Sequence, residues 1–191
     1  QVIQAPRGRA SQMNAGAAAA RGEILLFLHA DTLLPPGAFE LIQKQLSRPS
    51  IEAGTFRLSF NENTPLLRFY SWCTWIRTPL ICFGDRGLFA LRTTFEAVGG
   101  YPDLPMYEDL ELARSLYDRG GFVFADLSVT TAARRFERNG AVLQQLRNTG
   151  LWLYYFLGGD PNRAAAYYSY RSTPMARHHT DTPTSWDSDS G

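Results

Sequence analysis

Asp31 is the residue with the clearest chemical potential, because it comes just after a short apolar run, Glu23 to His29. Such a run is typical of a strand buried on both faces of a parallel sheet. Open α/β sheets bind ligands beyond the carboxyl ends of their strands. A carboxylate at that place suits a hard divalent cation that also holds a diphosphate. A turn or helix-capping role for Asp31, ahead of Pro35 and Pro36, is the alternative.

His29 stands two residues before Asp31, a spacing that puts alternate strand residues on the same side. A satisfied core histidine is the simpler interpretation of this residue. Hydrolases with an aspartyl nucleophile also have an apolar strand that ends in Asp-x-Asp-x-Thr. Here His29 occupies the position of the first aspartate, which removes the carboxylate that would attack phosphorus. The sequence therefore disfavours this hydrolase chemistry.

Two adjacent carboxylates, Glu108 and Asp109, open a helix predicted from 108 to 119. Carboxylates are favoured at a helix N-terminus, so capping alone explains the pair. In a functional interpretation, one carboxylate caps the helix while the other points into a cleft as a general base. We expect Asp109 to be the cleft residue.

Arginine supplies almost all of the positive charge, since Lys44 is the only lysine. Arg134 and Arg135 come just after a strand predicted to end at Thr131, where a guanidinium pair suits a diphosphate. A solvated pair is an equally good interpretation. Arg9 precedes a predicted helix, whose N-terminus attracts phosphate.

The elements that must position these residues alternate along the chain in the manner of an open α/β sheet. Apolar patterns and breakers predict helices over 10–21, 37–46, 64–80, 108–119 and 139–157, and strands over 23–29, 53–60, 88–91, 122–125 and 128–131. The segment 172–191 is too polar to offset its ordering entropy, so we expect a disordered tail after a domain of residues 1–171.

Composition excludes several classes of protein. With 191 residues and 45% hydrophobic content, the chain suits one domain with a core. A formal net charge of +1 gives no sign of a nucleic-acid partner. The apolar runs are shorter than the roughly 20 residues of a membrane span. Cys73 and Cys82 lack metal-ligand spacing and form no disulfide framework, so we expect a cytoplasmic location.

Five motifs stand in order along the chain. They are Gly8-Arg-Ala-x-Gln-Met-Asn-Ala-Gly16, His29-Ala-Asp31-Thr32, Gly84-Asp85-x-Gly87, Glu108-Asp109-x-Glu111-Leu112 and Arg134-Arg135-Phe136. In this order and spacing they resemble glycosyltransferase family 2, whose members have the GT-A fold, and the resemblance extends to about Tyr170. More narrowly, the chain resembles the branch known as radical-SAM/selenodomain-associated transferases.

The resemblance implies an α/β GT-A fold with a mostly parallel central sheet flanked by helices, and a nucleotide-diphosphate sugar as donor. It implies that Asp31 binds Mn²⁺ or Mg²⁺ at the donor diphosphate. It makes Asp109, next to Glu108, the catalytic base of an inverting displacement. The substrate-binding residues that it implies are Arg9, Asn14, His29, Asp85, Arg134 and Arg135.

The GT-A fold normally begins with a strand-helix-strand segment that has no counterpart after Gln1. The resemblance therefore implies an amino-terminally truncated, partial domain with a shortened sheet. Two alternatives stay open. The aromatic stretches 64–80 and 152–156 suit a lipid-phosphate glycosyltransferase at a membrane surface, and an incomplete transferase suits a noncatalytic interaction module. The residues identify neither the sugar, the acceptor nor the oligomeric state.

Overall fold

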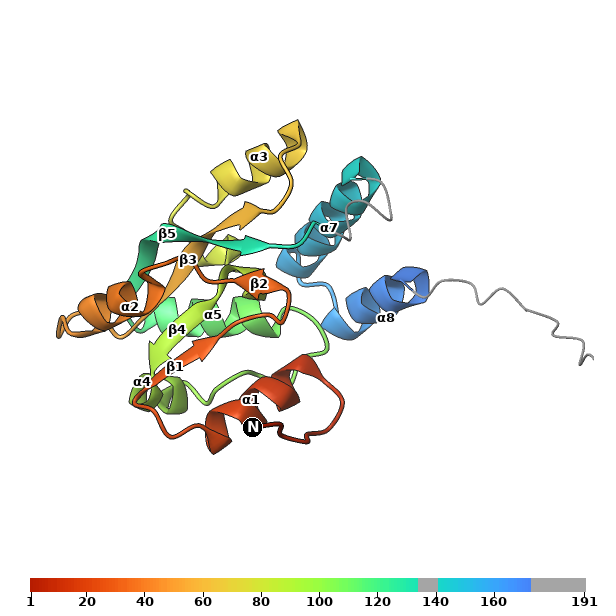
Figure 1. The fold of residues 1–191 in the computed structure, drawn as a ribbon. Coiled ribbons are helices and arrows are strands. Elements are labelled where there is room, and N and C mark those ends of the chain that lie inside the picture. The colour runs from red at the N-terminus through yellow and green to blue at the C-terminus, as the bar shows by residue number, and fades with distance from the viewer. Residues whose placement is uncertain (134–140, 173–191) are drawn as a thin grey trace, which may run out of the picture.

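The computed structural model describes residues 1–133 and 141–172. The predicted diphosphate-binding residues Arg134 and Arg135, and the predicted tail from residue 173 onward, lie outside the described residues. A sheet of five strands crosses the middle of the molecule, and helices lie on both of its faces (Figure 1). The strand order is β1-β4-β3-β5-β2. This is an α/β architecture, as the sequence predicted.

The sheet is mixed, and the prediction of a mostly parallel sheet is wrong. Only β3 and β5 pair in parallel among the described strands, whereas the other three pairs are antiparallel. An apolar run reports burial on both faces but not the direction of the neighbouring strand, and β4 runs against both of its neighbours. The strands are β1 (Ile24–Phe27), β2 (Thr32–Leu33), β3 (Ala53–Phe60), β4 (Leu88–Leu91) and β5 (Phe122–Thr131).

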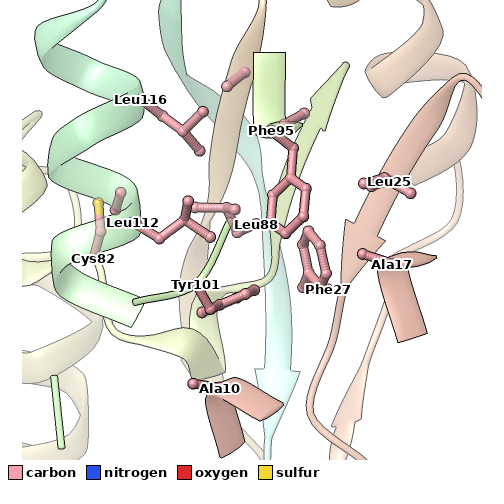
Figure 2. Close-up of a cluster of buried hydrophobic side chains, with 13 residues drawn as sticks. Ala10, Ala17, Leu25, Phe27, Cys82, Leu88, Phe95, Tyr101, Leu112 and Leu116 are labelled. Carbon is pink, nitrogen blue, oxygen red and sulfur yellow. The ribbon is translucent and has the colours of Figure 1, made fainter. Parts of the chain in front are cut away.

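Alternating strand side chains divide the interior between the two faces of the sheet. Leu88 and Ala90 point to one face, against the helices α1 (Arg9–Ala19), α4 (Arg92–Ala97) and α5 (Glu108–Asp118) (Figure 2). Phe89 points to the opposite face, against α2 (Ala38–Leu46). The strand β1 contributes side chains to both cores, so its predicted burial on two faces is confirmed.

The long aromatic helix predicted over 64–80 is shorter than expected. The helix α3 (Pro65–Cys73) ends at Thr74, and a separate 3₁₀ turn, η1 (Pro79–Ile81), follows. The hydroxyl of Thr74 donates to the carbonyl oxygen of Ser71 at 2.7 Å. Proline lacks an amide hydrogen and clashes with the preceding turn, so Pro79 ends any continuous helix before it.

Other elements also differ from the sequence prediction. The two strands predicted over 122–131 form the single strand β5, with a register shift opposite Thr55 and Arg57. The short strand β2, the short helix α4 and the helix α8 (Pro161–Ser172) were not predicted. The helix predicted from 139 is α7 (Ala141–Phe156), and it packs with α8 beside the start of α5. Among the described residues, no helix is long and apolar enough to span a bilayer.

Candidate active site

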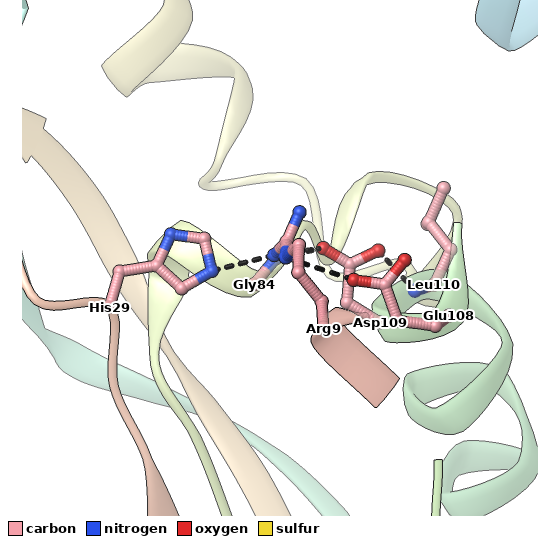
Figure 3. A network of polar contacts seen from close by, with 6 residues as sticks. All are labelled: Arg9, His29, Gly84, Glu108, Asp109 and Leu110. Atoms are coloured by element: carbon pink, nitrogen blue, oxygen red, sulfur yellow. Dashed lines mark hydrogen bonds and ion pairs between the residues drawn. The ribbon is translucent and has the colours of Figure 1, made fainter. Parts of the chain in front are cut away.

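Four segments that are far apart in sequence meet beside the N-terminus of α5 (Figure 3). Arg9 begins α1, and His29 lies in the turn that follows β1. Gly84 begins the 3₁₀ turn η2 (Gly84–Arg86), and Glu108 and Asp109 begin α5. The structure therefore brings together residues from four of the five motifs.

The guanidinium of Arg9 is the centre of this cluster. Its Nε lies 3.0 Å from Glu108 Oε1, and its Nη2 lies 3.5 Å from Asp109 Oδ2. The same Nη2 donates a hydrogen bond of 2.7 Å to His29 Nε2. Because a guanidinium only donates, this bond requires the neutral tautomer of His29 with its proton on Nδ1. The Arg9 side chain is still 52% exposed, so it also faces solvent.

The two carboxylates sit in a buried and negatively charged setting. Glu108 is only 2% exposed, and Asp109 is 8% exposed. Burial raises the pKa of Glu108, and the charge of Asp109 raises it further, whereas Arg9 opposes both effects. Two adjacent acids at a helix N-terminus are thus held together by one shared cation.

Backbone amides fix the orientation of Asp109. Its Oδ2 accepts a hydrogen bond of 2.5 Å from the amide of Gly84, and its Oδ1 accepts one of 2.8 Å from the amide of Leu110. A carboxylate offers about four lone-pair positions, and because Oδ2 also faces Arg9 Nη2, it is Oδ1 that keeps capacity for another donor. Asp109 is therefore held in one position without being saturated.

Replacing Gly84 with alanine should disturb the cluster directly. A Cβ at Gly84 would lie 2.8 Å from His29 Nε2, 2.9 Å from Arg9 Nη2 and 3.0 Å from Asp109 Oδ2. These atoms are side-chain ends that can shift, so we expect Gly84→Ala to keep its fold but to break the hydrogen bond between Arg9 and His29, which the nitrogen chemical shifts of the His29 ring detect. Gly16→Ala is the matched control, because nothing lies within 4 Å of its new Cβ. Unchanged His29 shifts in Gly84→Ala would contradict this packing argument.

Tyr107 holds the start of α5 in a strained conformation. Its φ of 69° is the only positive value among the described non-glycine residues. Its ring stacks on Tyr155 of α7 at 4.5 Å, and Tyr155 donates to Glu111 Oε1 at 2.7 Å. Strain of this kind persists where the surrounding structure enforces it, and it clusters at functional sites. The helix α7 therefore supports the backbone next to Glu108 and Asp109.

Asp85 and Arg86 continue the chain behind Gly84. The Oδ1 of Asp85 is buried and has no hydrogen-bond partner among the described residues. Burial raises the pKa of Asp85 to about 6, and Asp109 adds to this effect, while Arg86 and Arg9 oppose it. The half-buried Asp85 is thus poised to lose its proton at a pH well above that of a free aspartate.

Asp85 should make the protein less stable as the pH rises. The pKa of an aspartate in an unfolded chain is 3.8 and that of Asp85 in the folded chain is about 6, so the native state binds more protons between these values. The free energy of unfolding then falls as pH rises from about 4 to 6. We expect Asp85→Asn to flatten this fall and to gain roughly 1 to 3 kcal/mol at pH 7. Urea unfolding at several pH values measures it, with the exposed Asp103→Asn as control.

The opposite result has a clear meaning. If the stability of Asp85→Asn follows the same pH curve as the parent chain, the ionised carboxylate of Asp85 is not held in an unfavourable setting. The slope between pH 4 and 6 would then come from other groups.

Asp31 lies in the turn that is closed by a hydrogen bond from the Thr32 amide to the His29 carbonyl oxygen. Its carboxylate is exposed and forms no hydrogen bond or ion pair with the described residues. The described part of the chain holds no cluster of three or more metal-binding side chains. Mg²⁺ commonly uses one or two carboxylates, waters and substrate phosphates, and Asp31 fits a site of that type.

The structure places Asn14 differently from the other predicted residues. Its side-chain amide donates to the Tyr101 carbonyl oxygen at 2.8 Å and accepts from the Tyr101 amide at 2.9 Å. These bonds attach α1 to the loop after α4, so contact with a substrate stays a prediction for Asn14.

The sequence analysis missed Tyr107, Tyr155 and the buried Arg86. A positive φ or a partner more than 40 residues away leaves no local signal in a sequence.

Comparison with solved structures supports the fold. The chain is similar to the mannosyltransferase PcManGT from Pyrobaculum calidifontis in complex with GDP-Man and Mn²⁺, with a TM-score of 0.57 and 20% identity. The match covers 86% of this chain and 49% of that chain, so the described protein spans about half the length of this neighbour. A mycobacterial protein is matched at 21% identity over 68% of this chain and 44% of that one, with a TM-score of 0.42. No curated protein matches the sequence.

A protein-family model also matches the chain. The model of glycosyl transferase family 2 matches residues 1–97, which is just over half of the chain. The match includes Arg9, His29 and Gly84, three members of the cluster, but it ends before Glu108 and Asp109. Together with the GT-A-like fold, it shows that the chain belongs to glycosyl transferase family 2.

Proposed function

We propose that this protein transfers a sugar from a nucleotide-diphosphate donor to an acceptor hydroxyl, with inversion at the anomeric carbon. The observation that carries the proposal is the convergence of Arg9, His29 and Asp109 from distant segments of a family 2 chain. A buried carboxylate next to a half-exposed guanidinium combines a base with a phosphate-binding group. Both are needed for a displacement that expels a diphosphate.

Asp109 is the proposed general base. It removes the proton of the acceptor hydroxyl while that oxygen attacks the anomeric carbon. The bond between this carbon and the diphosphate oxygen breaks, and its electron pair leaves with the nucleoside diphosphate. The amides of Gly84 and Leu110 hold the carboxylate in place, which limits the reorganisation that the reaction requires. The proton ends on Asp109.

Arg9 and Glu108 act as a unit in this proposal. Glu108 binds Arg9 Nε, which leaves the exposed side of the guanidinium available to the donor diphosphate. The two N–H groups of Arg9 Nη1 are not used in these contacts, so they can donate to phosphate oxygens while the positive charge attracts the leaving group. His29 accepts from the same guanidinium and limits its position.

Asp31 would hold Mn²⁺ or Mg²⁺ together with the donor diphosphate. Such an ion supplies neutralisation of the charge that develops on the leaving nucleoside diphosphate. The exposure of Asp31 suits this role, because it leaves room around the ion for ligands from the donor and from water. The similarity to a mannosyltransferase with GDP-Man and Mn²⁺ supports GDP-mannose as the first donor to test.

Calorimetry tests the proposal without requiring an acceptor. We expect GDP-mannose or UDP-glucose to bind more tightly with Mn²⁺ than with EDTA, and Asp31→Ala to remove most of this difference. Removing a protein ligand of a shared ion should cost about tenfold or more in donor affinity. Asp103→Ala, another exposed aspartate in a loop, is the control. If neither donor binds with Mn²⁺ or Mg²⁺, the proposed function is wrong.

A further inference from the structure

A groove of about 340 Å³ lies between the end of β3 and the helix α3. This volume falls within the range of roughly 300 to 1,000 Å³ that is typical of small-molecule sites. The groove is formed by segments outside the Arg9 cluster. The residues that matter here are Ser59, Glu62, Asn63, Arg68, Trp72 and Trp75.

The two tryptophans lie at the surface rather than in the core. Trp72 is 61% exposed and Trp75 is 60% exposed. The guanidinium of Arg57 lies 3.6 Å from the centre of the Trp75 ring, and Arg57 is itself paired with Asp126. One side of Trp75 is thus supported by a cation, while much of the residue still faces solvent. A supported and exposed indole is a stacking surface.

The polar residues around these rings provide both donors and acceptors. Glu62 and Asn63 come from the turn after β3, and Arg68 comes from α3. Glu62 and Arg68 have opposite charges, so the pair does not select an anion or a cation. A ligand with weakly polarised C–H faces and many neutral hydroxyls matches such a surface, because the C–H groups stack on the indoles and the hydroxyls bond to the rim.

We propose that this groove binds a carbohydrate chain, which is the acceptor of the transfer. The identity of the acceptor rests on the proposed function, but binding of the carbohydrate does not. The acceptor class is therefore an oligosaccharide or a glycan-bearing molecule, with sugar residues behind the reacting hydroxyl held on Trp72 and Trp75.

Hydrogen bonds connect the groove to the proposed base. Trp75 follows Thr74, whose carbonyl oxygen accepts from Arg86 Nη2 at 3.2 Å and whose hydroxyl accepts from the Leu58 amide. Arg86 belongs to η2, and the first residue of η2, Gly84, donates its amide to Asp109. The groove and Asp109 are thus attached to the same internal framework, which suits two parts of one acceptor site.

A membrane surface would use different residues. Ile76 is 53% exposed and Phe69 is 54% exposed, and neither lines the groove. Insertion into lipid depends on the total exposed apolar area, so Ile76 would contribute as the tryptophans do. Stacking of a sugar depends on the indole rings alone. Substitution of Ile76 therefore distinguishes a lipid surface, whose binding it should weaken, from a carbohydrate, whose binding it should not.

The experiment measures carbohydrate binding to the whole chain in the absence of donor. Calorimetry with mannotetraose, chitotetraose and maltotetraose should show binding of at least one of them. Trp72→Ala and Trp75→Ala should each weaken this binding by about tenfold. Ile76→Ser and Phe39→Ala should leave it unchanged, since Phe39 is a 63% exposed aromatic residue on α2. Circular dichroism checks that each variant is folded.

Three results would overturn the inference. One is the absence of binding by all three oligosaccharides, and another is equal binding by the tryptophan variants and the parent chain. The third is that the protein sediments with vesicles of equal parts phosphatidylcholine and phosphatidylglycerol, and that Ile76→Ser reduces this sedimentation as strongly as Trp75→Ala. That result would identify a lipid-binding surface. Donor binding with Mn²⁺ is measured separately, so loss of the proposed function and loss of this site are distinguishable.

Discussion

Asp109→Asn should lower kcat for sugar transfer by about 10² to 10⁴, which is the usual contribution of a general base. The amide has nearly the shape of the carboxylate, and its Oδ1 retains the capacity to accept from the Leu110 or Gly84 amide. It cannot take the proton of the acceptor hydroxyl at neutral pH. Donor affinity measured by calorimetry should change little compared with kcat, because Arg9 keeps its ion pair with Glu108.

Asp118→Asn is the control for this prediction. Asp118 ends the same helix, is exposed, and pairs with Arg114 at 3.7 Å. It should retain full activity, since an exposed ion pair contributes about 0 to 1 kcal/mol. A value of kcat for Asp109→Asn within a few fold of the parent would exclude Asp109 as the base. Glu108, which is nearer to Arg9 Nε, would then be the carboxylate to test.

The sequence was sufficient to predict the segments that form the site. Burial periodicity predicted β3 over 53–60 and β4 over 88–91 with the observed bounds, and it placed the helices α1, α2 and α5 to within two residues at each end. The site residues Arg9, His29 and Asp109 were predicted because each stands at the end of such an element. A short loop next to a strong periodic pattern is the place where sequence analysis is most informative.

Other parts of the arrangement depend on tertiary contacts that have no local signal. The direction of β4 is set by its packing between β1 and β3. A run of four apolar residues gives the same hydrophobic pattern whether the strand is parallel or antiparallel to its neighbours. Thr55 is a polar residue that alternates with the apolar residues of β3, yet it is buried and donates to the Gly87 carbonyl oxygen at 2.8 Å. Arg86 bonds to several distant segments, yet its sequence context is that of an ordinary loop arginine.

Arg86 is buried to 1% exposure and connects three segments through backbone carbonyl groups. Its Nε donates to Phe56 of β3 at 2.9 Å, and its Nη2 donates to Thr74 after α3 at 3.2 Å. Its Nη1 lies 3.4 Å from the Ile81 carbonyl oxygen and 3.7 Å from the Cys82 sulfur. Burial lowers the pKa of Arg86, which shows that burying the cation costs free energy. Part of the free energy gained from these hydrogen bonds offsets that cost.

We therefore expect Arg86→Met to lower the free energy of unfolding by about 3 kcal/mol, from the carbonyl groups of Phe56, Thr74 and Ile81 left without a donor. The value is below the sum of the lost bonds, because the variant no longer buries a charge. Urea unfolding measures it. Arg119→Met removes only a partly exposed pair with Glu52 and should lose less than about 1 kcal/mol. Equal losses in the two variants would mean that Arg86 does not hold these segments together.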